Sequence, residues 1–99
     1  MAKEDLKYDS KIRARIIISG RVQGVMFRDS MKRKADKLGV CGWVRNIPNR
    51  RVEAVLEGDK LNVLDLIEWA HKGSFLARVD EVKIFWDDYK KEFNDFIIS

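Results

Sequence analysis

The sequence predicts an α+β domain of the ferredoxin-like class, a βαββαβ sandwich in which two helices cover one face of an antiparallel sheet. The chain has 99 residues, which suits one compact domain. Along it, the spacing of apolar residues alternates between the period of a strand and that of a helix, in the order β-α-β-β-α-β. Because crossover connections have a preferred hand, this order leads to the split βαβ sandwich.

The first part of the chain predicts a strand, a glycine-containing turn and a helix. Apolar residues alternate over residues 12–18, which is typical of a half-buried strand. Gly20 and Gly24 then interrupt the strand. From Phe27 onward the apolar residues recur at helical spacing, and Gly39 ends the predicted helix.

The middle of the chain predicts a β-hairpin. Its strands are expected over residues 41–47 and 52–57. The loop 48–51 joins them, and Asn49 in this loop tolerates a left-handed backbone.

The last part predicts a second helix and further strands. Asp59 offers an N-cap, and Gly73 ends the helix. Residues 79–86 alternate as a fourth strand, and the apolar residues of 93–98 predict a short strand or an extended tail. Residues 1–10 lack periodicity, so we expect a flexible leader before a domain that spans residues 11–99.

Composition excludes several classes of protein. Cys41 is the single cysteine and His71 the single histidine, which excludes an intramolecular disulfide and a four-ligand Cys/His zinc site. No apolar run approaches the about 18 residues of a membrane span, and no signal peptide is evident. We therefore expect a cytoplasmic protein without a metal or a membrane partner. Cys41 is expected to act as a small core residue.

Positive charge is concentrated in one third of the chain. The net charge is +4, whereas residues 21–51 alone carry nine Lys/Arg against two acidic residues. Such a field attracts anions, either nucleic acid, acidic lipid or a small phosphorylated substrate. Charge alone favours a solvated basic helix face and does not choose among these partners.

The loop 20–28 has the properties of an anion site. Gly20 and Gly24 let the backbone turn, and the loop leads into a helix N-terminus with unpaired amide groups. Arg28 lies in the first helical turn, where its guanidinium can bind two phosphate oxygens. The pattern by itself also fits an ordinary turn, and it lacks the Gly-Lys-Ser/Thr ending of a nucleotide-binding P-loop.

Two longer strings carry a family resemblance. Residues 20–25 (GRVQGV), followed by Phe27 and Arg28, together with residues 42–46 (GWVRN), resemble the signatures of the acylphosphatase family. The resemblance covers residues 12–99 and implies a metal-free and cofactor-free hydrolase. Its substrates would be acyl phosphates, which it would split into carboxylate and inorganic phosphate.

The resemblance also implies the site residues. Arg28 matches the phosphate-binding arginine, and Asn46 matches the asparagine that orients the attacking water. The loop amides would hold the phosphoryl group, from Gln23, Gly24, Val25, Met26, Phe27 and Arg28. The expected partners are the small acyl phosphate and inorganic phosphate, as product or inhibitor, and the family default is a monomer.

Some residues depart from the family pattern. Met26 stands where the family often has Gly, Asn49-Arg50 where Asp-Gly is common, and Lys91 where Gly usually precedes the last strand. Ser74 follows Gly73 where Pro is frequent. These departures affect loop rigidity more than the identity of the site.

Two other functions remain to be weighed. RNA-recognition domains share the βαββαβ order, but their third strand needs aromatic residues, and residues 51–57 have none and include two acids. A regulatory domain that binds carbamoyl phosphate without turnover is the other alternative. Because the sequence has no appended domain, a free-standing enzyme is the preferred interpretation.

Overall fold

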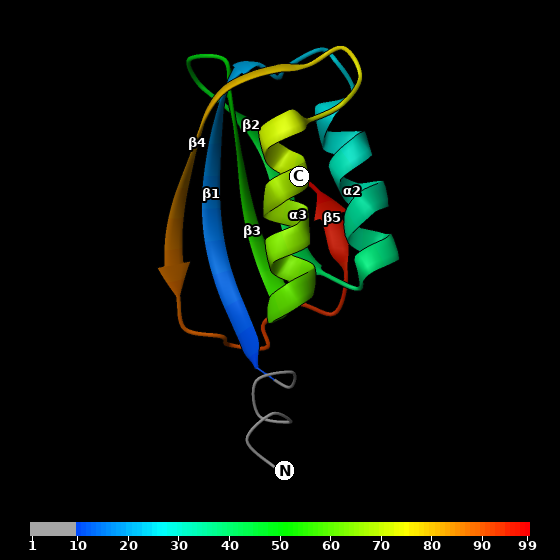
Figure 1. Ribbon diagram of the computed structural model, residues 1–99, viewed down its shortest axis with the longest axis vertical. Coiled ribbons are helices and arrows are strands. Elements are labelled where there is room, and N and C mark those ends of the chain that lie inside the picture. Colours follow the sequence, from blue (N-terminus) through cyan, green and yellow to red (C-terminus); the bar gives the residue numbers. More distant parts are fainter. Residues whose placement is uncertain (1–9) are drawn as a thin grey trace.

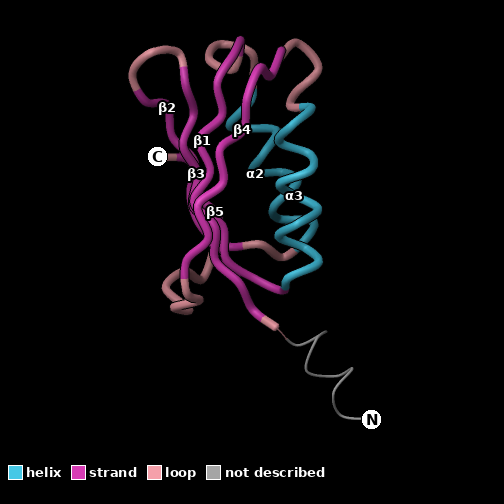
Figure 2. Tube along the Cα trace, turned by 60° about the vertical axis from the view of Figure 1, so that its left-hand side comes forward, coloured by secondary structure: helices cyan, strands magenta, loops and turns pink. Residues whose placement is uncertain are grey.

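Two helices pack on one face of a five-stranded sheet in the computed structural model, which describes residues 10–99 (Figure 1). Figure 2 shows both helices on the same side of the sheet. This confirms the predicted ferredoxin-like fold. In chain order the elements are β1 (Lys11–Arg21), α2 (Phe27–Leu38), β2 (Cys41–Ile47), β3 (Arg51–Asp59), α3 (Lys60–Lys72), β4 (Arg78–Asp87) and β5 (Phe96–Ile98).

The sheet has the strand order β4-β1-β3-β2-β5. Its four long strands pair antiparallel, as predicted. The short strand β5 pairs parallel with β2, so it adds a parallel edge that the sequence pattern did not specify. The predicted leader lies outside the described residues apart from Ser10, whose carbonyl accepts the Lys60 amide at 3.0 Å.

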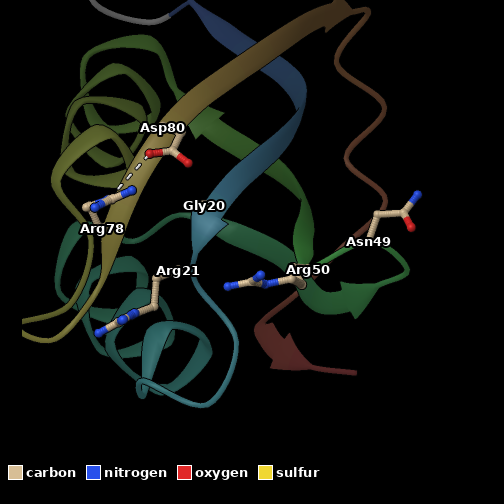
Figure 3. A pocket seen from close by; sticks show the side chains of 6 residues that line it. All are labelled: Gly20, Arg21, Asn49, Arg50, Arg78 and Asp80. Carbon is tan, nitrogen blue, oxygen red and sulfur yellow. Dashed lines mark ion pairs between the residues drawn. The ribbon is translucent and has the colours of Figure 1, made fainter.

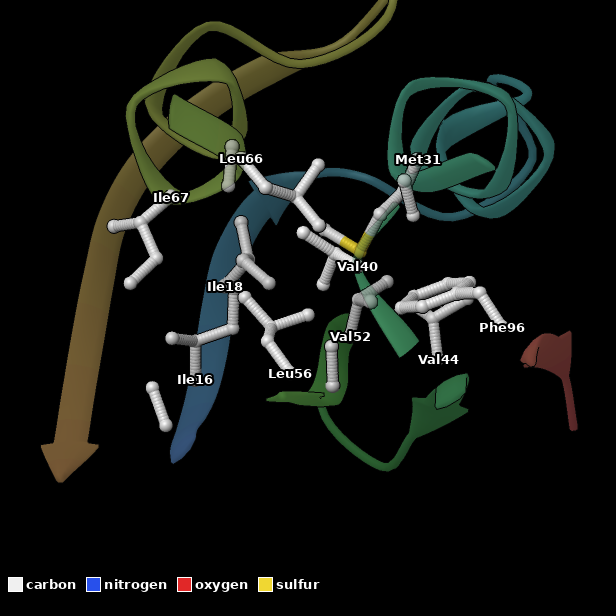
Figure 4. Packing of buried hydrophobic residues seen from close by; sticks show 14 of the residues in the cluster. Ile16, Ile18, Met31, Val40, Val44, Val52, Leu56, Leu66, Ile67 and Phe96 are labelled. Carbon is white, nitrogen blue, oxygen red and sulfur yellow. The ribbon is translucent and has the colours of Figure 1, made fainter. Parts of the chain in front are cut away.

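The core lies between the helices and the sheet (Figure 4). The apolar residues expected to face inward from α2 and α3 are buried, except that Leu38 is half-buried at the end of α2. Burying each large aliphatic side chain stabilises the fold by about 1.5–3 kcal/mol. Cys41 was expected in this core but is only half-buried at the start of β2, where burial raises the pKa of its thiol. The largest buried side chains include Phe27, Phe96, Ile16, Ile18, Met31, Leu56 and Leu66.

Backbone geometry explains where both helices begin and end. Gly39 and Gly73 follow them with left-handed φ angles of 71° and 79°. Asp59 occupies the N-cap position of α3 as predicted, but its carboxylate makes no capping hydrogen bond and pairs instead with Lys11. Within residues 10–99, neither helix has the length and apolar character that crossing a membrane requires.

Candidate active site

The loop between β1 and α2 is held by buried side chains at both of its ends. Val22 and Phe27 are each 1% exposed and belong to the core. Between them, Gly24 and Met26 adopt left-handed backbones with φ of 75° and 63°. The Met26 side chain is 58% exposed, so the loop backbone turns over an apolar base and meets solvent on its outer side.

Backbone amides along this loop are free to bind a ligand. Within residues 10–99, no amide of residues 23–29 donates a hydrogen bond to a backbone carbonyl. Ser30 is the first residue of α2 to do so, to the Met26 carbonyl at 3.0 Å. The unpaired N–H groups and the positive end of the helix dipole together favour an anion here.

Two side chains fasten the loop to other parts of the fold. Gln23 Nε2 donates to the carbonyls of Ile47 and Arg51, each at 2.9 Å, and so ties the loop to the β2–β3 hairpin. Ser74 Oγ donates to the Val25 carbonyl at 2.6 Å and ties it to the segment after α3. The sequence predicted Gln23 only as a backbone donor and gave Ser74 no contact with the loop.

Arg28 lines a hollow of about 240 Å³ at the start of α2. Its Nη1 lies 3.5 Å from the Ser99 carbonyl oxygen, which is at the limit of a hydrogen bond, so most of the guanidinium's donors stay available. Four of the six predicted loop residues line this hollow, whereas Gln23 and Val25 do not. The full lining is Val22, Gly24, Met26, Phe27, Arg28, Asp29 and Ile98.

Asn46 lies near the end of β2, outside the lining of this hollow. It is exposed and pairs in register with Val52 on β3. Two contacts link its strand to the Arg28 side of the site. The Ser99 amide donates to the Val44 carbonyl at 2.8 Å while the Ser99 carbonyl faces Arg28, and Gln23 binds the carbonyl of Ile47, the residue after Asn46.

A second hollow of about 360 Å³ opens at the same end of the sheet (Figure 3). It is formed by the end of β1, the hairpin loop and the start of β4, and its lining residues are Gly20, Arg21, Asn49, Arg50, Arg78 and Asp80. In the described part of the chain, no group of three or more His, Cys, Asp or Glu side chains is placed to hold a metal ion.

Comparison with known proteins gives a consistent result. A family model described as Acylphosphatase matches residues 14–98. The chain is 57% identical over 88 residues to an acylphosphatase of Pyrobaculum calidifontis, covering 88% of this chain and 80% of the relative. It is 58% identical to an acylphosphatase of Thermococcus kodakarensis, covering 79% and 86%. A solved acylphosphatase structure from Coxiella burnetii superposes with a TM-score of 0.85 at 32% identity, covering 90% of this chain and 93% of that one.

Proposed function

The chain belongs to the acylphosphatase family, whose members hydrolyse acyl phosphates, and on this basis we propose that the loop 23–28 and Asn46 perform the reaction here. An acyl phosphate is a mixed anhydride of a carboxylic acid and phosphoric acid. Water attacks the phosphorus atom, the P–O bond to the acyl oxygen breaks, and a carboxylate and inorganic phosphate leave.

Phosphate binding is assigned to the loop amides and Arg28. The observation that carries this proposal is that the unpaired amides of residues 23–29 and the guanidinium of Arg28 belong to one loop and helix start beside one hollow. Phosphoryl transfer depends mainly on positioning and on stabilising charge at the phosphoryl oxygens. Fixed N–H donors and a bidentate guanidinium supply both of these needs without a metal ion.

Water positioning is assigned to Asn46. Its amide both accepts and donates hydrogen bonds, so it can orient a water molecule but does not take up a proton at neutral pH. The proton lost by the water goes to a phosphoryl oxygen of the substrate, and the departing carboxylate is stable without a strong general acid. The bond from Gln23 to Ile47 supports this role because it fixes the strand end that bears Asn46 against the loop.

The proposal extends to the setting in which the protein works. Inorganic phosphate would remain a ligand as product and inhibitor, because it keeps the oxygens that the site holds. We place the protein in the cytoplasm as a monomer, with no cofactor and no nucleic-acid partner. The monomer rests on the family resemblance; on the open face of the sheet, Glu53 pairs with Arg15 at 3.1 Å and with Arg45 at 2.8 Å, while Phe85 and Ile97 stay partly exposed.

Hydrolysis of benzoyl phosphate in the presence of EDTA tests the proposal. The native protein is compared with Arg28→Ala, Asn46→Ala and the matched control Arg33→Ala, which removes an equal charge from an exposed position on α2. We expect turnover that survives EDTA, does not titrate near neutral pH, collapses in the two site variants and persists in the control. Phosphate binding without turnover by the folded native protein would support the regulatory-domain alternative instead.

A further inference from the structure

The larger hollow beside the phosphate loop is rich in unpaired positive charge. Its lining has three arginines and one carboxylate, and that carboxylate, Asp80, lies 3.6 Å from Arg78. Within residues 10–99, neither Arg21 nor Arg50 forms an ion pair or a hydrogen bond through its side chain. Figure 3 shows Arg50 reaching from the hairpin toward β1, while Arg78 points toward Asp80.

Strand register places two of these arginines opposite one another. Arg21 on β1 pairs directly with Arg78 on β4. Like charges at directly opposed positions of neighbouring strands repel and destabilise the sheet. Asp80 offsets part of this repulsion through its contact with Arg78, and an anion bound between the two arginines would relieve the rest.

Two residues of the hairpin loop that line the hollow have left-handed backbones. Arg50 has a left-handed φ of 58°, and Asn49 before it has a φ of 68°. A left-handed backbone costs a residue with a Cβ about 1–2 kcal/mol relative to its preferred conformation. Glycine would adopt this backbone without the strain, but it has no guanidinium. An arginine at this position therefore points to a role for its side chain.

Gly20 lines the hollow with its backbone alone. The register between β1 and β4 shifts between Ser19 and Gly20, which is a β-bulge at the point where the loop leaves the sheet. A Cβ atom at Gly20 would lie 2.2 Å from the carbonyl oxygen of Arg78, so only glycine fits there. Bulges of this kind occur beside functional sites, where they change the direction of neighbouring side chains.

From these observations we propose that the hollow receives a negatively charged group on the acyl part of the substrate. The protein then prefers acyl phosphates that carry a second anionic group, a carboxylate or a phosphate, over those with an uncharged acyl chain. This inference rests on the proposed function, because it assumes that the loop 23–28 holds the reacting phosphoryl group. Arg21 lines the larger hollow and its chain neighbour Val22 lines the smaller one, so one short loop borders both hollows. The inference requires one substrate to reach both of them.

Two substrates of equal carbon number separate this preference from hydrolysis itself. Glutaryl phosphate carries a free terminal carboxylate, and pentanoyl phosphate lacks it. Phosphate release is measured for both, and the ratio of their kcat/KM values is the selectivity. We expect the native protein to favour glutaryl phosphate by about tenfold, as suits charge-assisted hydrogen bonds from guanidinium groups.

Variants of the hollow should change this ratio in both directions. Arg50→Asn removes the charge but places at this position a residue that tolerates the left-handed backbone. We expect it to lower the ratio of kcat/KM values by about five- to tenfold, and we expect the same of Arg78→Gln. Asp80→Asn removes the competing carboxylate and should raise the ratio. Arg33→Gln removes a charge from α2 and should leave the ratio unchanged. Circular dichroism confirms that each variant folds.

The results distinguish failure of the proposed function from failure of the acyl-group preference. If the folded native protein hydrolyses neither substrate, the proposed function is wrong and this inference is wrong with it. If it hydrolyses both and the ratio is close to one or ignores Arg50→Asn and Arg78→Gln, only this inference is overturned. If the hollow instead binds a free anion, the protein should show no preference for the carboxylate substrate. Sulfate should then change pentanoyl phosphate hydrolysis by the native protein, and by a different amount in Arg50→Asn. This result would also overturn the inference.

Discussion

Arginine side chains have opposite surroundings at the two ends of the sheet. Near the start of β1, Arg13 contacts three carboxylates, those of Glu57 at 3.0 Å, Glu92 at 2.9 Å and Asp87 at 3.5 Å. Glu57 is buried and also accepts the amides of Lys90 and Glu92, which anchors the segment between β4 and β5. Every charge in this cluster is therefore satisfied by the protein itself.

At the opposite end, where the loop 22–26 and the hairpin lie, positive charge has little internal compensation. Arg21 and Arg50 have no side-chain partner among residues 10–99, and Arg28 approaches only a carbonyl oxygen. A guanidinium that is fully paired stabilises the fold, whereas one left unpaired keeps its donors for a ligand. If the unpaired arginines bind the substrate as proposed, the protein separates its stabilising charges from its binding charges by the length of the sheet.

The largest effect is expected from a change that keeps the charge of the binding end and alters only its shape. Arg28→Lys retains a cation but loses the planar fork that we propose binds two phosphoryl oxygens, so we expect kcat/KM for benzoyl phosphate to fall by about 10²-fold. The midpoint of thermal unfolding should stay unchanged, because Arg28 makes no strong contact in the fold. An active Arg28→Lys protein would show that charge alone suffices and would contradict the bidentate role.

The next effect tests the stabilising end. The Glu57 side chain is 2% exposed, and its carboxylate accepts hydrogen bonds from Arg13 and from the Lys90 and Glu92 amides. Glu57→Gln leaves these three donors with one acceptor oxygen. We expect the free energy of unfolding in urea to fall by about 2 kcal/mol, with turnover per folded molecule retained. Glu92→Gln is the matched control, since its side chain is 53% exposed and its loss should change little.

Acid should weaken the same end first. Burial alone would raise the pKa of Glu57, but hydrogen bonds from the Lys90 amide, Arg13 and the Glu92 amide together lower it below the ordinary value of 4.5. Because the folded protein holds this carboxylate ionised more strongly than the unfolded chain does, its contribution is full above about pH 4.5 and is lost as the pH falls through the lower folded pKa. Urea unfolding between pH 7 and pH 3 should therefore show a steeper loss of stability for the native protein than for Glu57→Gln.

The smallest effect compares two strained positions, one at each end. Met26 and Lys91 both have left-handed φ angles, 63° and 50°, a backbone conformation that favours glycine. Replacing either by glycine removes the strain but adds freedom to the unfolded chain, so we expect a net gain of no more than about 1 kcal/mol. Only Met26→Gly should also change kcat/KM, because Met26 lines the hollow of Arg28. An equal change in activity from Lys91→Gly would contradict the separation of the two ends.

Much of the fold followed from apolar spacing and glycine positions. The strand 41–47 was predicted with its observed ends, and α2 begins at Phe27 as expected. The first strand extends to Arg21, three residues past the prediction. Ser19, Gly20 and Arg21 pair with β4 through their backbones at a bulge, and such pairing leaves no alternation of apolar residues to detect.

The site was predictable only in part. Arg28 and Asn46 came from signature strings, and both lie near the proposed phosphate loop or the strand beside it. The bonds of Gln23 and Ser74 had no local signal, because each side chain binds a carbonyl that is 24 or more positions away along the sequence. The arginine-rich hollow likewise depends on the register of β1 against β4, which side-chain spacing within one strand does not specify.

One paired measurement tests the separation of binding and stabilising charges most directly. Turnover of benzoyl phosphate and the free energy of unfolding are measured on the same preparations of native protein, Arg28→Ala and Glu57→Gln. We expect Arg28→Ala to lose turnover and keep its stability, whereas Glu57→Gln loses stability and keeps its turnover. If either substitution lowers both quantities to a similar extent, binding and stabilising charges are not separated between the two ends of the sheet.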